Sequence, residues 1–116
     1  MDIKKLLIAI SVSPFLEISK WTLKKYYIIL SEIIRLYIEE RFRVSAIERT
    51  TAELYQEMRV KDIERKHCSM LKDLLDQCDL VKFAKFIPEK TEITQDLARA
   101  YEIIDLTKEV LPVEPV

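Results

Sequence analysis

The 116-residue chain contains no glycine. Glycine supplies the positive φ angles of tight β-hairpins and lets a backbone approach phosphate groups closely. Its absence argues against hairpin-rich folds, a P-loop and a glycine-rich dinucleotide-binding motif. Apolar residues make up 49% of the chain and charged residues 34%, a mixture that excludes an intrinsically disordered chain. These features favour one small all-α domain over residues 1–116.

Apolar residues recur with the period of a helix, which predicts a compact bundle of about five helices. The second helix is predicted to be long and central, because two neighbouring apolar stripes run along it. One stripe comprises Leu23, Tyr27, Leu30, Ile34, Tyr37 and Ile38, and the other Tyr26, Ile29, Ile33 and Leu36. Its polar positions are predicted to face solvent: Lys24, Ser31, Glu32, Arg35 and Glu39. The predicted helices cover about residues 2–10, 19–42, 50–59, 62–84 and 91–107.

Three local signals set the predicted helix boundaries. Thr50 and Glu53 have the spacing of a capping box, in which each side chain binds the other residue's backbone N–H. Pro88 is predicted to end the fourth helix, since proline cannot continue one. Thr91 is predicted to cap the last helix.

The only histidine, His67, and the two cysteines, Cys68 and Cys78, do not form a convincing metal site. A structural zinc site needs four ligands, and adjacent residues of a helix point about 100° apart. The cysteines are about 15 Å apart along one helix, which is too far for a disulfide. We therefore expect reduced cysteines, a packing histidine and no metal.

Carboxylates are plentiful but lie at the spacing of solvated surface pairs. They include Glu39, Glu40, Asp73, Asp76 and Asp79. A di-iron bundle motif would need two histidines. We therefore expect no catalytic residue and no cofactor. Asp79 and Lys82 lie in an apolar stretch and could pair with each other or reach Glu40 or Arg41. At least one of the two is expected to be half buried.

Cations and aromatic residues mix near the start of the second predicted helix. Such a mixture could bind nucleic acid or lie near a membrane, or the aromatic rings could be core and the lysines solvated. Residues 1–49 hold nine basic and six acidic residues, although the whole chain has a net charge of −1. The apolar run at residues 6–16 is too short to span a membrane. The residues of the mixed stretch are Lys20, Trp21, Lys24, Lys25, Tyr26 and Tyr27.

Two stretches carry a family resemblance. The first is YYxxLSEIIRxYIEERF at residues 26–42, followed by ERTTxEL at residues 48–54. The second is LxxLLxxCDLVKFAKF at residues 71–86. Together they resemble the C-terminal cytoplasmic helical domain of bacterial membrane proteins of the Bat aerotolerance (BatD-like) family, over about residues 20–107.

The resemblance implies a setting. Proteins of that family are associated with MoxR-type AAA ATPases and von Willebrand A proteins, and the domain follows a transmembrane helix. It implies that this chain is a fragment of a larger membrane-anchored protein, on the cytoplasmic side of the inner membrane. It carries over no catalytic residue. The recurring residues are expected to be structural or to bind a partner: Arg35, Tyr37, Glu40, Arg41, Thr50, Thr51, Asp79, Lys82 and Phe83.

Three functional hypotheses follow, in order of preference. The first is a non-catalytic interaction module that docks a MoxR-type ATPase or a von Willebrand A protein. The second is a nucleic-acid-binding domain that uses the basic N-terminal half. The third is a cryptic enzyme, which would need a pocket with converging polar groups.

Overall fold

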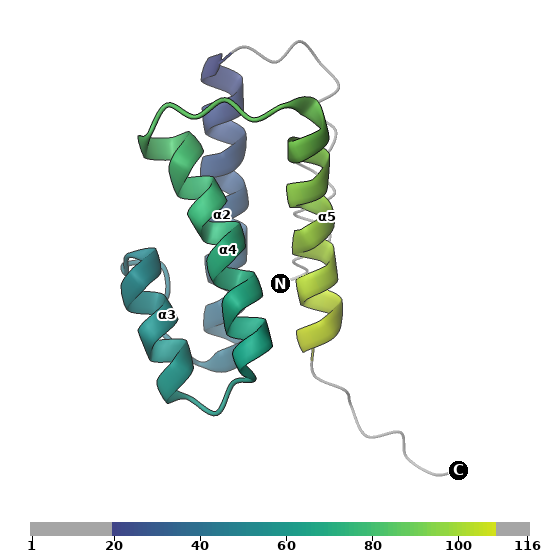
Figure 1. The fold of residues 1–116 in the computed structure, drawn as a ribbon. Helices are drawn as coiled ribbons and strands as arrows, with labels where there is room; N and C mark the ends of the chain where they lie inside the picture. The colour runs from purple at the N-terminus through teal and green to yellow at the C-terminus, as the bar shows by residue number, and fades with distance from the viewer. Residues whose placement is uncertain (1–19, 109–116) are drawn as a thin grey trace, which may run out of the picture.

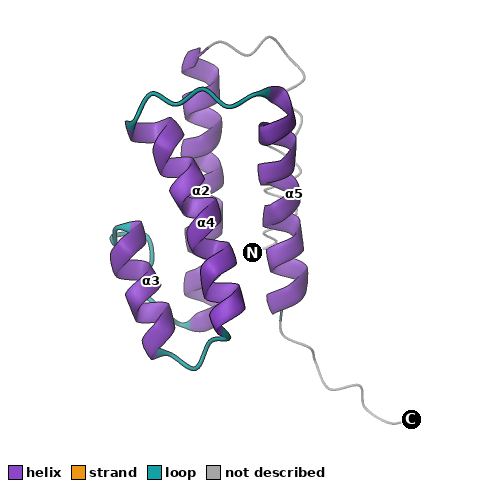
Figure 2. Cartoon of the chain, in the orientation of Figure 1, coloured by secondary structure: helices purple, strands orange, loops and turns teal. Residues whose placement is uncertain are grey.

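The computed structural model describes residues 20–108, which form four helices joined by short loops, with no strand among them (Figures 1 and 2). Helix α2 covers Lys20–Phe42, α3 covers Thr51–Val60, α4 covers Arg65–Phe83 and α5 covers Lys90–Thr107. The predicted all-α class is confirmed. About five helices were expected, and this part of the chain holds four. The helix predicted at residues 2–10 lies outside the described residues.

Helix α4 packs against each of the other three helices (Figure 1). Helices α2 and α5 run in the same direction and are joined by side-chain hydrogen bonds at both ends. Tyr27, early in α2, bonds to Asp96 in the first half of α5, and Tyr37, late in α2, bonds to Thr107 at the end of α5. Helix α4 runs in the opposite direction to both of them (Figure 1). Helix α2 thus contacts both α4 and α5, and its wide apolar surface predicts contacts on more than one side.

The first predicted stripe on α2 forms the core. All six of its residues are buried, and Tyr27, Leu30, Ile34 and Ile38 have no exposed surface. Leucines of α4 and isoleucines of α5 complete the same apolar cluster. Burial of these side chains is the main stabilising contribution, at roughly 1.5–3 kcal/mol for each large one.

The predicted solvent side of α2 is partly wrong. Ser31 and Arg35 are buried, at 1% and 7% exposed, whereas Ile29 of the second stripe is 42% exposed. The connector of residues 43–50 and the start of α3 fold back over Arg35, and the end of α4 reaches Ser31 through Lys82. Local periodicity reports which side chains are apolar, and it does not report where a later segment of the chain will pack.

Helix α3 begins as predicted. The Thr50 hydroxyl accepts a hydrogen bond from the Glu53 N–H, and the Glu53 carboxylate accepts one from the Thr50 N–H, both at 3.1 Å. The capping box is thus confirmed. Leu54 and Met58, one turn apart, are fully buried against α4 and fasten this short helix.

Helix α4 begins at Arg65, three residues later than predicted, and ends at Phe83. Pro88 is not its terminator. The helix ends because Lys85 adopts a left-handed conformation, with φ 57°. The Leu80 carbonyl then accepts hydrogen bonds from the N–H groups of both Ala84 and Phe86.

The N-cap of α5 is also corrected. Glu89 takes this position, in an extended conformation after Pro88, and its N–H donates to the Glu92 carboxylate at 3.3 Å. Thr91 lies inside the first turn and is exposed. A carboxylate at a helix N-terminus can cap as a hydroxyl does and also interacts favourably with the helix dipole.

Candidate functional site

Arg35 lies at the centre of a buried polar network between α2, α3 and the connector. Its Nη1 donates to the carbonyl oxygens of Ala46 at 2.8 Å and Arg49 at 2.7 Å. Its Nη2 donates to the hydroxyl of Thr51 at 3.1 Å. Because the guanidinium is a planar fork of fixed donors, it holds these acceptors in a defined arrangement.

Thr51 passes this network on to α4. Its hydroxyl accepts from Arg35 and donates to Oδ2 of Asp79 at 2.7 Å. The three residues come from three different helices, α2, α3 and α4. The charges of Arg35 and Asp79 thus compensate each other through a neutral hydroxyl.

Glu39 holds the connector from the same side of α2. Its Oε1 accepts the N–H groups of Ala46 at 2.9 Å and Ile47 at 3.1 Å. These two hydrogen bonds lower the pKa of the Glu39 carboxyl. Arg35 and Glu39 are one turn apart, so a single face of α2 binds both the carbonyls and the amides of the connector.

The Arg35 network joins parts of the protein to one another. The guanidinium donates to protein oxygens, and the hydroxyl of Thr51 accepts one hydrogen bond and donates another. Removing one member would leave buried polar groups without partners, which is costly. The network therefore fixes how α3 lies on α2 and α4.

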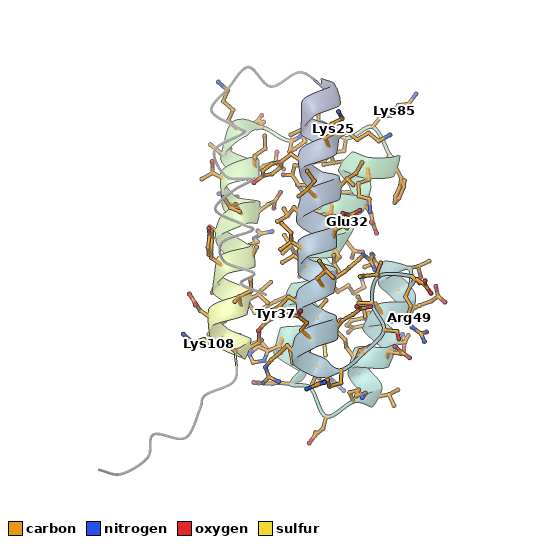
Figure 3. All side chains as sticks on the ribbon, turned by 180° about the vertical axis from the view of Figure 1, so that it is seen from behind. Lys25, Glu32, Tyr37, Arg49, Lys85 and Lys108 are labelled. Carbon is orange, nitrogen blue, oxygen red and sulfur yellow. The ribbon has the colours of Figure 1, made fainter. Side chains whose placement is uncertain are left out.

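Two other predicted residues, Tyr37 and Arg41, meet at the far end of α5. The Tyr37 hydroxyl lies 2.6 Å from Oγ1 of Thr107, and Nε of Arg41 donates to the Thr107 carbonyl. Figure 3 shows Tyr37 between α2 and α5. These side chains satisfy carbonyl groups at the end of a helix that would otherwise lack partners.

The remaining predicted residues are separated from one another. Thr50 is the cap of α3, and Glu40 is exposed on α2. Lys82 donates to the hydroxyl of Ser31 at 3.3 Å, and Phe83 is 76% exposed. The nine predicted residues do not form one site. They divide among the Arg35 network, the contacts with Thr107, the cap of α3, the bond from Lys82 to Ser31 and two separate exposed side chains.

For Asp79 and Lys82, the expected burial is confirmed and the expected pairing is wrong. Both side chains are partly buried, as expected. In place of a pair with each other or with Glu40 or Arg41, Asp79 bonds to Thr51 and Lys82 bonds to Ser31. These two bonds join the C-terminal part of α4 to α3 and to α2.

Sequence reasoning missed a second buried polar pair. The Tyr27 hydroxyl donates to Oδ2 of Asp96 at 2.5 Å, and Asp96 is only 2% exposed. Burial raises the pKa of Asp96, although hydrogen bonds from Tyr27 and Gln77 and the nearby Arg99 act in the opposite direction. Burial likewise raises the pKa of Tyr27. One signal was available: Asp96 lies three residues from Ile93 and four from Ala100, on the apolar face of α5.

Both cysteines are buried. Both are free thiols, and Cys68 and Cys78 lie on α4 without exposed surface. Burial raises the pKa of the Cys78 thiol to about 12. His67 is partly buried, with Nε2 3.6 Å from the Glu64 carboxylate. Among the described residues, no three histidine, cysteine or acidic side chains lie close enough together to hold a metal ion.

Two of the three aromatic residues in the mixed stretch, Tyr26 and Tyr27, lie inside the protein. Tyr26 and Tyr27 are 5% and 0% exposed and contact each other edge to face, with ring centroids 5.4 Å apart. Lys24 and Lys25 remain exposed. Trp21 lies among the residues whose side chains the structure does not describe. This surface therefore offers cations but not the rings of Tyr26 and Tyr27.

Among the described residues, three exposed apolar side chains lie where α4 ends and the loop to α5 follows: Leu80, Phe83 and Ile87, which we name the apolar end. Their exposed fractions are 46%, 76% and 52%. Leu80 and Phe83 share a face of α4, and Ile87 follows in the loop to α5. Nζ of Lys82 lies 4.9 Å from the centre of the Phe83 ring.

Between residues 20 and 108, no helix combines the length and the apolar character needed to cross a lipid bilayer. No protein-family model, curated protein or solved structure matches this chain.

Proposed function

We propose that this chain is a non-catalytic helical module that docks a protein partner through the apolar end. The observation that carries the proposal is the exposure of Phe83, at 76% of its surface, beside the partly exposed Leu80 and Ile87. Burying one large aromatic side chain at an interface contributes roughly 1.5–3 kcal/mol. Aromatic residues are also enriched among the residues that dominate binding energy.

The hydrogen bonds between the helices support the same proposal. The Arg35 network and the Tyr37 pair with Thr107 tie α2 to α3, α4 and α5. A surface that is already ordered loses little conformational entropy on binding. The polar residues inside the bundle thus serve the interaction by holding its shape.

The partner is proposed from the resemblance to the Bat aerotolerance family. It would be a MoxR-type AAA ATPase or a von Willebrand A protein, met at the cytoplasmic face of a membrane that anchors the rest of the protein. Neither partner requires a reactive group on this domain, since docking needs only a complementary surface.

Binding measurements with purified proteins test this function. The chain is immobilised and exposed to the MoxR-type ATPase of the same genome with ATP, with ADP and without nucleotide, and separately to the von Willebrand A protein. Saturable binding of one of them is expected. Absence of binding to both proteins in every nucleotide state would overturn the proposed partners.

A further inference from the structure

A pocket opens beside the apolar end. It has a volume of about 440 Å³ and lies between the beginning of α2, the end of α4 and the loop that leads to α5. Its apolar walls come from Leu23, Val81, Phe86 and Ile87. Ile87 belongs both to the pocket and to the apolar end, whereas Leu80 and Phe83 do not line the pocket.

Three lysines complete the lining of this pocket: Lys24, Lys82 and Lys85. Among the described residues, no carboxylate lines it. Lys82 donates to the Ser31 hydroxyl, and none of the three lysines has an ion-pair partner within residues 20–108. The lining thus combines apolar walls with the positive charge of three lysines.

The backbone holds Lys85 at the pocket in a conformation that most residues avoid. Its φ angle of 57° falls in the left-handed region, where Cβ of a residue with a side chain lies too close to the backbone. The hydrogen bond from the Phe86 N–H to the Leu80 carbonyl, at 3.1 Å, closes this turn. Phe86 packs against the core from here, and the Lys85 side chain is left exposed beside the opening.

We infer that the pocket binds an acidic peptide segment of the partner, with one apolar side chain inside the pocket and flanking carboxylates on the three lysines. The inference rests on the proposed function and names the chemistry that the partner presents. Charge complementarity selects a ligand with negative groups, and the apolar walls select one that also carries an aliphatic or aromatic side chain.

The shape of the site favours a peptide over an anionic membrane surface. A bilayer presents a plane and binds best to a convex face that is uniformly basic. Here the lysines line a concavity between two helices and a loop.

The test uses a fluorescent eight-residue peptide in which Glu alternates with Leu and Phe, and its binding to the full chain is followed by polarisation. The pocket variant is Lys24→Glu with Lys85→Glu. The control variant, Arg65→Glu with Lys66→Glu, makes the same change of charge at exposed positions at the opposite end of α4. We expect the pocket variant to weaken binding at least about tenfold, and the control variant to change it less than about twofold.

Two further arms make the result independent of folding and of ligand source. Lys85→Gly removes the cation, and glycine adopts the left-handed conformation readily. This variant should therefore bind the peptide more weakly without a fall in the free energy of unfolding. Peptides with Lys in place of Glu, or Ser in place of Leu and Phe, should bind poorly. Equal loss in pocket and control variants would overturn the inference. So would binding of vesicles of phosphatidylglycerol and phosphatidylcholine without binding of the peptide.

Failure of this inference is distinguishable from failure of the proposed function. If the pocket variant binds the partner protein as tightly as the unmodified chain, but a Phe83→Ser variant does not, the acidic-segment inference falls and docking through the apolar end stands. If the peptide binds but neither partner protein does, the peptide-binding pocket is supported and the proposed partners are wrong.

Discussion

Lys82 places its Nζ atom 4.9 Å from the centre of the Phe83 ring and at the same time donates to Ser31 of α2. The lysine thereby links the interior of the bundle to the most exposed aromatic side chain among the described residues. A cation over an aromatic face contributes roughly 0.5–1 kcal/mol at an exposed site. This contact leaves most of the Phe83 ring available to another molecule.

Loss of the Arg35 guanidinium should be among the most damaging single changes in the chain. Arg35→Met leaves the carbonyls of Ala46 and Arg49 without their donor, and Asp79 without compensation. We expect the free energy of unfolding to fall by about 3 kcal/mol in urea titrations. Arg49→Met is the control, because its pair with Glu57 is more than a third exposed and contributes at most about 1 kcal/mol. Equal losses in the two variants would contradict the role given to Arg35.

The left-handed residue that follows α2 supplies a stabilising change. Arg43 has a φ angle of 58° and an exposed side chain. Arg43→Gly should raise the free energy of unfolding by about 0.5–1 kcal/mol, because glycine adopts this conformation without a steric penalty. Arg43→Val should lower it, since a β-branched side chain fits this region poorly. Thermal melts followed by circular dichroism measure both, and the reverse order would contradict the assigned backbone.

The buried Asp96 should give a distinctive pH dependence. Burial raises its pKa, so the folded state binds this proton more tightly than the unfolded state. The contribution of Asp96 to stability is therefore greatest at low pH and is lost as pH rises through the raised pKa. Asp96→Asn keeps an acceptor for Tyr27 and removes the charge.

Asp96→Asn should consequently be more stable than the unmodified chain at neutral pH, by an amount that shrinks as the solution approaches about pH 4. Both proteins share Glu39 and Glu53, whose lowered pKa values make the fold less stable in acid. The difference between the two urea curves at each pH cancels that common effect. A difference that grows on acidification would contradict a raised pKa for Asp96.

The two cysteines should react very slowly with thiol reagents while the protein is folded. Cys68 and Cys78 are fully buried, and burial raises the pKa of both thiols. A disulfide reagent at about pH 8 should modify them at least roughly a thousandfold more slowly in buffer than in concentrated urea. Absorbance of the released thiolate gives both rates. Rapid reaction of either thiol in buffer would show that α4 does not bury it.

The sequence predicted the apolar half of this fold better than its polar half. The stripe through Tyr27, Leu30 and Ile34 and the capping box of Thr50 depend on spacing within one segment, and both are confirmed. Spacing within α2 predicts a solvent-exposed Arg35. This prediction is wrong because a connector that follows α2 in the chain folds back over Arg35.

The candidate site shows the same limit. Resemblance pointed to Arg35, Thr51 and Asp79 separately, and only packing of three helices brings them into one network. The pocket could not be predicted, because it is formed by the beginning of α2, the end of α4 and a loop. The turn at Lys85 could not be predicted, because glycine is the usual sequence signal for a left-handed residue and this chain has none.

Partner binding by two matched surface variants tests the central claim most directly. Phe83→Ser and Val60→Ser each remove a strongly exposed apolar side chain, at 76% and 89% exposure, and they lie at the ends of α4 and α3, which are opposite ends of the bundle (Figure 1). Affinity for the MoxR-type ATPase or the von Willebrand A protein is measured by titration calorimetry. We predict that Phe83→Ser weakens binding at least about tenfold and that Val60→Ser leaves it unchanged. Equal affinity of Phe83→Ser and the unmodified chain would contradict docking through the apolar end.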